Sequence, residues 1–190
     1  MGKTIILASK SLGRKLLLEE AGFEVIIRPT LSDEEHIRTS VSQSVQLLAQ
    51  RKLHSFLLLE PNPAYPVLAS DTLLAFQNDE LGQPLDKEAA RSQLTALSGK
   101  THSVFSAWTL WANGSTYTGV DRTEVQFKEL TKHAIDSYLD TNEWVGAAGS
   151  YRYQGLGKEL VESITGDEST VIGLPMNQIF GILAKALPEW

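Results

Sequence analysis

The sequence of 190 residues contains no cysteine. This absence excludes disulfide bonds, thiolate nucleophiles and cysteine-based zinc or iron–sulfur sites, and it is typical of a reducing compartment. Positive charge is also scarce, because 17 lysines and arginines stand against 23 acidic residues and leave a net charge of −6. Proteins that coat nucleic acid normally carry a surplus of lysine and arginine. We therefore expect no nucleic-acid partner, and any phosphate chemistry must be local.

Long apolar runs are missing as well. No run approaches the roughly 18 residues of a membrane-spanning helix, and the first residues, MGKTIILASK, lack the long apolar region of a signal peptide. We therefore expect a cytoplasmic protein with no membrane partner. The hydrophobic content of 42% is sufficient for a real core. A chain of this length should form one domain or two small, closely apposed lobes.

Two further kinds of site lack their sequence signatures. The tripeptide GKT occurs at residues 2–4 and 99–101, but neither copy has the upstream glycine and loop of a Walker A motif. The histidines show no paired zinc-type spacing, so we expect surface or local hydrogen-bonding roles for all of them. They are His36, His54, His102 and His133.

The hydrophobic pattern predicts a mixed α/β chain. Asp86 is a candidate helix N-cap, Gly22 and Gly99 are placed to end helices, and Asn113-Gly114 suits the type I′ turn of a hairpin. Strands are predicted over 4–8, 23–29 and 66–76, a hairpin over 101–127, and helices over 13–23, 40–59, 87–98, 131–139 and 176–187.

The stretch LASKSLGR lies where the first strand passes into the first helix. It places Ser9, Ser11 and Arg14 beside a helix N-terminus, where free N–H groups and the helix dipole favour an anion. The alternative is that Ser11 only caps the helix while Arg14 is solvated.

Two charged residues lie within apolar patterns. Lys52 falls on the line of Val45, Leu48, Ala49 and Phe56, so it points inward or along the rim of a cleft, unless only its aliphatic stem is buried. Asp71 interrupts the apolar run VLASDTLLAF. Its carboxylate should pair with a cation, bind a metal or act as a base, the alternative being an edge-strand aspartate bonded to a neighbouring hydroxyl.

Two loops offer further candidates. The segment SDEEH supplies Asp33, Glu34 and Glu35 as companion metal ligands, or else forms a solvated loop. The segment AAGSYRYQG combines small residues, which let backbone approach a ligand, with Gln154, whose amide can read a nucleobase. Its alternative is a glycine-rich structural turn.

The order of these segments resembles the Maf family of nucleoside triphosphate pyrophosphatases over almost the whole chain. The family pattern LASxSPRRxxLL is matched by LASKSLGRKLLL, the acidic DE pair by Asp33-Glu34, and LAxxKA by LAQRKL with Lys52. SDT, LSGKTHSV, AGSYRYQGLG and VIGLP match four further family segments in the same order.

The resemblance implies one domain over residues 1–190, with an elongated mixed sheet flanked by helices and two lobes around a central cleft, as in ITPase-like proteins. It implies hydrolysis of a nucleoside triphosphate to the monophosphate and pyrophosphate with Mg, Mn or Co, and it makes a homodimer an expectation. By resemblance, Asp71 is the proton acceptor that activates water, and on physical grounds it could also help hold the metal. Glu34 is a candidate for binding the metal or for positioning charge, and it belongs with Asp71 and Lys52 to the catalytic set. Substrate-binding candidates are Ser9, Ser11, Gly13, Arg14, Thr72, Gln83 and Gln154.

The sequence also departs from the family. Gly13 replaces the first arginine of SPRR, and Gln83 replaces the lysine of GKP, so two cations near the triphosphate are missing. This loss should weaken phosphate binding or transition-state stabilisation. Thr72 and Gln154 resemble the branch that hydrolyses dTTP and UTP rather than the one preferring 7-methyl-GTP, which makes dTTP and UTP the expected substrates. The alternative is a catalytically weakened nucleotide-binding protein that acts in cell-division control.

Overall fold

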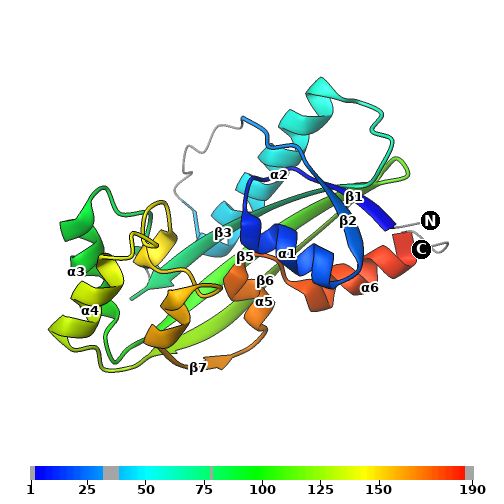
Figure 1. Cartoon of the computed structure of the whole chain (residues 1–190). Helices are drawn as coiled ribbons and strands as arrows, with labels where there is room; N and C mark the ends of the chain where they lie inside the picture. The colour runs from blue at the N-terminus through cyan, green and yellow to red at the C-terminus, as the bar shows by residue number, and fades with distance from the viewer. Residues whose placement is uncertain (1–2, 32–38, 78, 187–190) are drawn as a thin grey trace. The chain divides into compact units, whose positions relative to one another are not determined.

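The computed structural model describes residues 3–31, 39–77 and 79–186 (Figure 1). Every helix and strand expected from the sequence is present, and five short elements over residues 79–80, 148–150, 156–160, 161–165 and 168–172 are additional. In chain order the elements are β1 (Lys3–Leu7), α1 (Leu12–Glu20), β2 (Phe23–Ile27), α2 (Val41–Leu59), β3 (Val67–Phe76), β4 (Asp79–Glu80), α3 (Lys87–Leu97), β5 (Thr101–Ala112), β6 (Ser115–Phe127), α4 (Lys132–Leu139), η1 (Ala148–Ser150), η2 (Leu156–Leu160), β7 (Val161–Thr165), α5 (Glu168–Ile172) and α6 (Met176–Ala186).

Local sequence signals set the ends of several elements. Ser40 and Gln43 form a capping box at the start of α2, so two otherwise unpaired backbone amides of the first turn gain partners. Asp86 caps α3, as expected, by accepting a hydrogen bond from the third backbone amide of the helix at 2.7 Å. Asn113 and Gly114 have φ angles of 50° and 77°, which is the combination that a type I′ turn between β5 and β6 requires.

Within the described residues, seven strands form one sheet in the order β2-β1-β3-β5-β6-β7, with β4 paired to β3. Strand β1 runs parallel to β2 and β3, whereas β3 with β4 and β6 with β7 are antiparallel. The expected α/β class with a mixed sheet and flanking helices is thus confirmed. Among the described helices, none has both the length and the apolar character needed to cross a membrane.

The chain divides into two compact units. Unit 1 contains Met1–Asp71, Ser106–Asp121 and Gly173–Trp190, and unit 2 contains Thr72–Phe105 and Arg122–Ile172. Two units agree with the two lobes expected from the sequence. A cleft between them stays a prediction.

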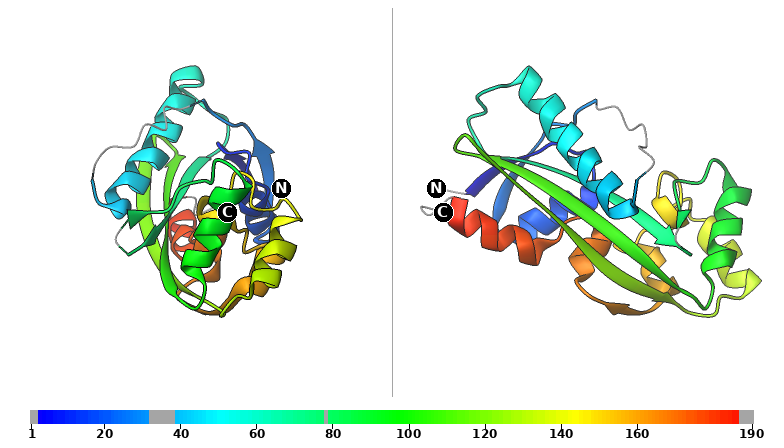
Figure 2. Two further views of the ribbon diagram at one scale, coloured as in Figure 1. Left: turned by 90° about the vertical axis from the view of Figure 1, so that its left-hand side faces the viewer. Right: turned by 180° about the vertical axis from the view of Figure 1, so that it is seen from behind.

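In unit 1 the strands carry apolar side chains on both faces. Ile5 and Leu7 of β1 belong to a cluster with residues of α1 and α6, whereas Ile6 and the following Ala8 belong to a cluster with residues of α2. This alternation follows from the two-residue period of a strand. Figures 1 and 2 show the result, with α2 on one side of these strands and α1 and α6 on the other.

Unit 2 has a core of its own. Leu94 of α3 and Ile135 of α4 pack in one buried cluster with Val125 and Phe127 of β6 and with Tyr151 of the loop after η1. Through Tyr151, this core holds the glycine-rich loop against α3, α4 and β6.

Candidate active site

The loop between β1 and α1 directs its two serines towards Arg14. Ser11 is the N-cap of α1, and its hydroxyl accepts a hydrogen bond from the backbone N–H of Arg14 at 3.4 Å. The Ser9 hydroxyl accepts from the backbone N–H of Ser11 and from Nη1 of Arg14, both at 3.2 Å. Lys10, between the serines, is exposed. Ser11 therefore has the capping role that the sequence left open, and Ser9 lies against the guanidinium.

Arg14 is buried, with 9% of its surface exposed, so the solvated alternative is wrong. Its Nε donates to the carbonyl oxygen of Gly173 at 3.1 Å and its Nη1 to the carbonyl oxygen of Ser70 at 2.8 Å. Burial lowers the pKa of the Arg14 guanidinium from its ordinary value, while the charge of Asp71 acts in the opposite direction. The guanidinium thus obtains in protein carbonyls the partners that a buried cation requires.

Lys52 of α2 and Asp71 of β3 form an ion pair between Nζ and Oδ1. Their side chains are 15% and 13% exposed. Each charged group thereby gains the counter-charge that it needs in apolar surroundings. The carboxylate remains partly accessible, as a group that takes a proton from water must be.

Unit 1 therefore brings together six of the predicted residues. Arg14 contacts Ser9 and the residue before Asp71, and Asp71 contacts Lys52. The N-cap residue Ser11 and the buried Gly13 of α1 flank this group. Phosphate-binding candidates and the candidate base thus come from the start of α1, from α2 and from the middle of β3.

The acidic cluster Asp33, Glu34 and Glu35 lies outside the described residues. In the part of the chain that is described, no group of three or more histidine or acidic side chains is placed to hold a metal ion. Magnesium is commonly held by one or two carboxylates together with substrate phosphates and water. Asp71 fits that mode of binding as one carboxylate, and Glu34 stays a predicted second ligand.

Unit 2 carries the remaining substrate-binding candidates. Thr72 lies in β3 directly after Asp71, and Gln83 is exposed on the segment after β4. A Cβ atom on Gly146 would lie 4.0 Å from Oε1 of Gln83 and 3.7 Å from Nη2 of Arg152. Gln83 therefore lies beside the glycine-rich loop that carries Arg152 and Gln154.

Hydrogen bonds hold this loop to its neighbours. The carbonyl oxygen of Gly82 accepts from the backbone N–H of Gly149 at 3.3 Å and from Nε2 of Gln93 at 3.1 Å. Nε of Arg152 donates to the carbonyl of Glu143 at 2.9 Å, and Nη2 donates to the carbonyl of Val145 at 2.7 Å. These hydrogen bonds give the loop a defined conformation, in which the side chain of Gln154 is exposed.

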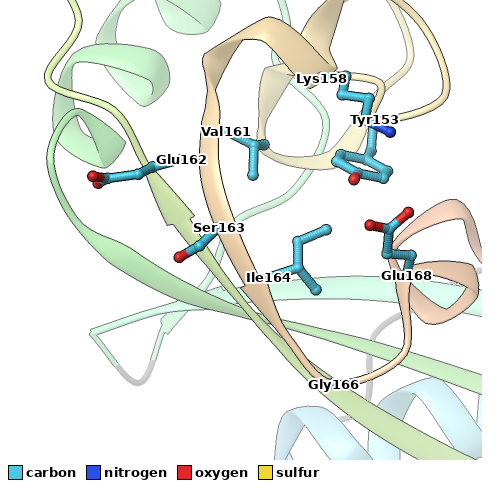
Figure 3. Close-up of a pocket in the computed structure, with 8 residues that line it drawn as sticks. All are labelled: Tyr153, Lys158, Val161, Glu162, Ser163, Ile164, Gly166 and Glu168. Atoms are coloured by element: carbon cyan, nitrogen blue, oxygen red, sulfur yellow. The ribbon is translucent and has the colours of Figure 1, made fainter.

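A pocket of about 270 Å³ lies in unit 2 next to the same loop (Figure 3). Its lining consists of Tyr153, Lys158, Val161, Glu162, Ser163, Ile164, Gly166 and Glu168, none of them a predicted site residue. The hydroxyl of Tyr153 points towards the carboxylate of Glu168, and Nζ of Lys158 lies 5.2 Å from the ring centroid. Burial raises the pKa of Tyr153, and the charge of Glu168 adds to this effect. These contacts fix the chain immediately before Gln154.

Sequence reasoning missed the positions of Ser70, Gly173 and His102. The first two lie in the matched segments SDT and VIGLP, but their role depends on a contact with Arg14 that no local pattern reveals. His102, expected at the surface or in a local hydrogen bond, is 2% exposed and its Nε2 lies 2.8 Å from the hydroxyl of Tyr151. The surface alternative is therefore wrong, and the partner lies 49 residues away.

With this geometry in place, comparison with known proteins gives a clear relationship. The family model of Maf-like proteins matches residues 4–186. The chain belongs to the Maf family. The matched range includes Ser9 and Arg14, Asp71 of β3, and the loop with Gln154.

Two relatives of the Maf chain share most of its length. The dTTP/UTP pyrophosphatase of Bacillus pumilus is 39% identical over 180 residues, which cover 94% of each chain. The dTTP/UTP pyrophosphatase of Bacillus thuringiensis subsp. konkukian is 41% identical over 181 residues, which cover 93% of this chain and 92% of the relative. A solved nucleoside-triphosphatase / dITP/XTP pyrophosphatase from Mycobacterium abscessus is 14% identical, with a TM-score of 0.44 and coverage of 96% and 95%.

Proposed function

We propose that this Maf protein is a pyrophosphatase that hydrolyses dTTP and UTP to the nucleoside monophosphate and pyrophosphate. The observation that carries the proposal is the ion pair of Lys52 and Asp71. Arg14 joins this pair to the loop before α1, because its guanidinium donates hydrogen bonds both to the Ser9 hydroxyl and to the carbonyl of Ser70, the residue before Asp71. Relatives about 40% identical over more than nine-tenths of the chain carry the name dTTP/UTP pyrophosphatase.

The reaction needs a positioned water and neutralisation of phosphate charge, but no covalent step by the protein. A water oxygen forms a new bond to phosphorus, the phosphorus–oxygen bond between the α- and β-phosphates breaks, and pyrophosphate leaves. Asp71 accepts the proton of that water. Lys52, which orients the carboxylate in the free protein, and exposed Lys10 supply positive charge to the triphosphate, and the Ser9 hydroxyl supplies a hydrogen-bond donor.

A divalent cation that arrives with the nucleotide would neutralise part of the triphosphate charge. Asp71 is the described carboxylate suited to hold it, with Glu34 as its companion. Ser11 caps the helix that carries Gly13, and Gly13, Thr72 and Gln154 are the positions that set the preference for dTTP and UTP. Gln83 is a substrate-binding residue at the position where the family pattern GKP has a lysine for the triphosphate. We also propose a homodimer, which light scattering tests.

The decisive experiment measures pyrophosphate release from a panel of nucleoside triphosphates in Mg²⁺, Mn²⁺ or Co²⁺. We expect the highest kcat/KM with dTTP and UTP and loss of turnover in Asp71→Asn at an unchanged melting temperature. Asp79→Asn removes an exposed carboxylate outside the candidate site and serves as the matched control. Clearly faster hydrolysis of 7-methyl-GTP than of either pyrimidine triphosphate would overturn the substrate assignment.

A second candidate function follows from the missing cations at positions 13 and 83. A Maf protein with weakened triphosphate binding could keep nucleotide affinity, lose turnover and act in cell-division control. Nucleotide binding that raises the melting temperature by mass action, without pyrophosphate release in any metal, would favour this function over the enzyme.

A further inference from the structure

Three residues from distant parts of unit 1 form a closed set of hydrogen bonds next to Asp71. The carbonyl oxygen of Gly173 accepts from the Ser70 hydroxyl at 2.7 Å and from Nε of Arg14 at 3.1 Å. Nη1 of Arg14 donates to the carbonyl oxygen of Ser70 at 2.8 Å. We call Arg14, Ser70 and Gly173 the carbonyl clamp.

Burial makes the clamp rigid. Ser70 is fully buried and Arg14 is 9% exposed, so neither can exchange these partners for water. An arginine presents its donors in a fixed planar fork, and here two of them point at two backbone carbonyls. Turning the guanidinium towards a ligand would leave both carbonyls and the hydroxyl of Ser9 without this donor.

Gly173 supplies a conformation that other residues rarely adopt. Its φ angle is 123°, in the region that favours glycine. Because this backbone conformation aims the carbonyl of residue 173 at Arg14 and Ser70, a side chain at this position would strain the clamp itself.

The clamp acts on the candidate base through the chain. The carbonyl of Ser70 is part of the peptide unit that joins Ser70 to Asp71, so the Arg14 bond fixes the orientation of that unit. Lys52 holds the other end of Asp71 at its carboxylate. Asp71 is thus held from its backbone and from its side chain.

We infer that Arg14, Ser70 and Gly173 are positioning residues that aim the Asp71 carboxylate at the attacking water, and that Arg14 is not a ligand of the triphosphate. The inference rests on the proposed function of Asp71 as proton acceptor. According to this inference, Ser9 and Lys10 of the loop before α1 contact the substrate, whereas Arg14 of α1 holds the candidate base.

The test compares Ser70→Ala, Gly173→Ala and Arg14→Lys with the wild type in steady-state hydrolysis of dTTP. A displacement of about 1 Å in a catalytic group can cost about 100-fold in rate. We expect kcat to fall by about 10- to 100-fold while KM changes by less than about twofold. Lys15→Met removes a half-buried cation of α1 that pairs with Glu19, and it should leave both constants unchanged.

Two further measurements separate positioning from general damage. In the Asp71→Asn background, Ser70→Ala should cause no further loss of the residual turnover, because the clamp acts through Asp71. Hydrogen–deuterium exchange should increase in peptides covering residues 67–76 in all three variants, a readout that needs no turnover. The stoichiometry of dTMP binding reports the fraction of folded protein, and Ser70→Ala is the mild variant if Arg14→Lys does not fold.

A rise in the KM for dTTP of tenfold or more in Arg14→Lys at unchanged kcat would overturn the inference and make Arg14 a substrate ligand. Unchanged kcat together with unchanged exchange in Ser70→Ala and Gly173→Ala would also overturn it. Wild-type protein that hydrolyses no triphosphate would instead refute the proposed function, while the exchange experiment would still report whether the clamp holds β3.

Discussion

The imidazole Nε2 of His102 lies 2.8 Å from the hydroxyl oxygen of Tyr151, and both side chains are buried in unit 2. Both rings also meet Phe127 edge to face, at centroid distances of 5.0 Å and 4.9 Å. No described residue partners the Nδ1 atom of His102. A neutral imidazole is therefore enclosed by aromatic rings beneath the loop that presents Gln154.

This environment predicts an acid-sensitive stability. Burial lowers the pKa of His102 from 6.5 to about 4. Above pH 6.5 the His102 imidazole is neutral in both the folded and the unfolded protein. Between pH 6.5 and about pH 4 it is protonated in the unfolded chain but stays neutral in the folded protein. The free energy of unfolding should therefore fall by up to about 3 kcal/mol as the pH decreases through this window.

Urea unfolding of the wild type and of His102→Gln between pH 7.5 and pH 4 measures this effect. The variant should lack the contribution of His102 to the pH dependence of the free energy of unfolding. The difference in that free energy between the two proteins should therefore narrow as the pH falls. His133→Gln, at an exposed position of α4, is the control and should retain the full dependence. Parallel curves for wild type and His102→Gln would show that His102 takes up its proton as readily in the fold as in the unfolded chain.

A second prediction concerns the glycine at the centre of η1. Gly149 has a φ angle of 68°, and a Cβ atom there would lie 2.5 Å from Cδ1 of the buried Leu74. Gly149→Ala therefore adds overpacking, about 1–3 kcal/mol, to the cost of a positive φ angle.

Gly22 offers a matched control, because its φ angle is 86° and no atom lies within 4 Å of its would-be Cβ. Gly22→Ala should show the backbone cost alone. Thermal or denaturant unfolding should thus place Gly149→Ala about 1–3 kcal/mol below Gly22→Ala. Equal losses in the two variants would mean that Leu74 moves aside freely.

A third prediction concerns the exposed Gln83. In the sequence, Gln83 stands where the resembling pattern GKP has a lysine, and in the structure it lies beside the loop of Gly146 and Arg152. Gln83→Lys should raise kcat/KM for dTTP and UTP, by up to about tenfold, which corresponds to about 1.4 kcal/mol. Its melting temperature should stay unchanged, because the side chain is exposed.

Pyrophosphate release by Gln83→Lys is compared with release by Leu85→Lys, which adds the same charge at a residue that is 98% exposed. Activity that rises equally in both variants would reflect the net charge of the protein rather than a contact with the triphosphate.

Most of the fold could be read from the sequence because its signals are local. Ile5 and Ile6 point to opposite faces by the period of a strand, and Asn113-Gly114 defines its own turn. Strand β7, Val161–Thr165, escaped prediction because three of its five residues are polar and its alternation is weak.

The site was harder to predict, because its geometry depends on long-range partners. The sequence indicated that Lys52 and Asp71 each needed a counter-charge, but only the packing of α2 against β3 makes them partners. The same pattern could not decide whether Arg14 is solvated or buried, since its acceptor on Gly173 lies 159 residues away.

That separation has a consequence for synthesis on the ribosome. Unit 1 is assembled from three segments, and the last of them begins at Gly173. A nascent chain that ends before this residue has its candidate base and the lysine that pairs with it, but not the carbonyl that Arg14 and Ser70 share. Catalytic competence should therefore arise late in translation, in one step, when the last segment docks.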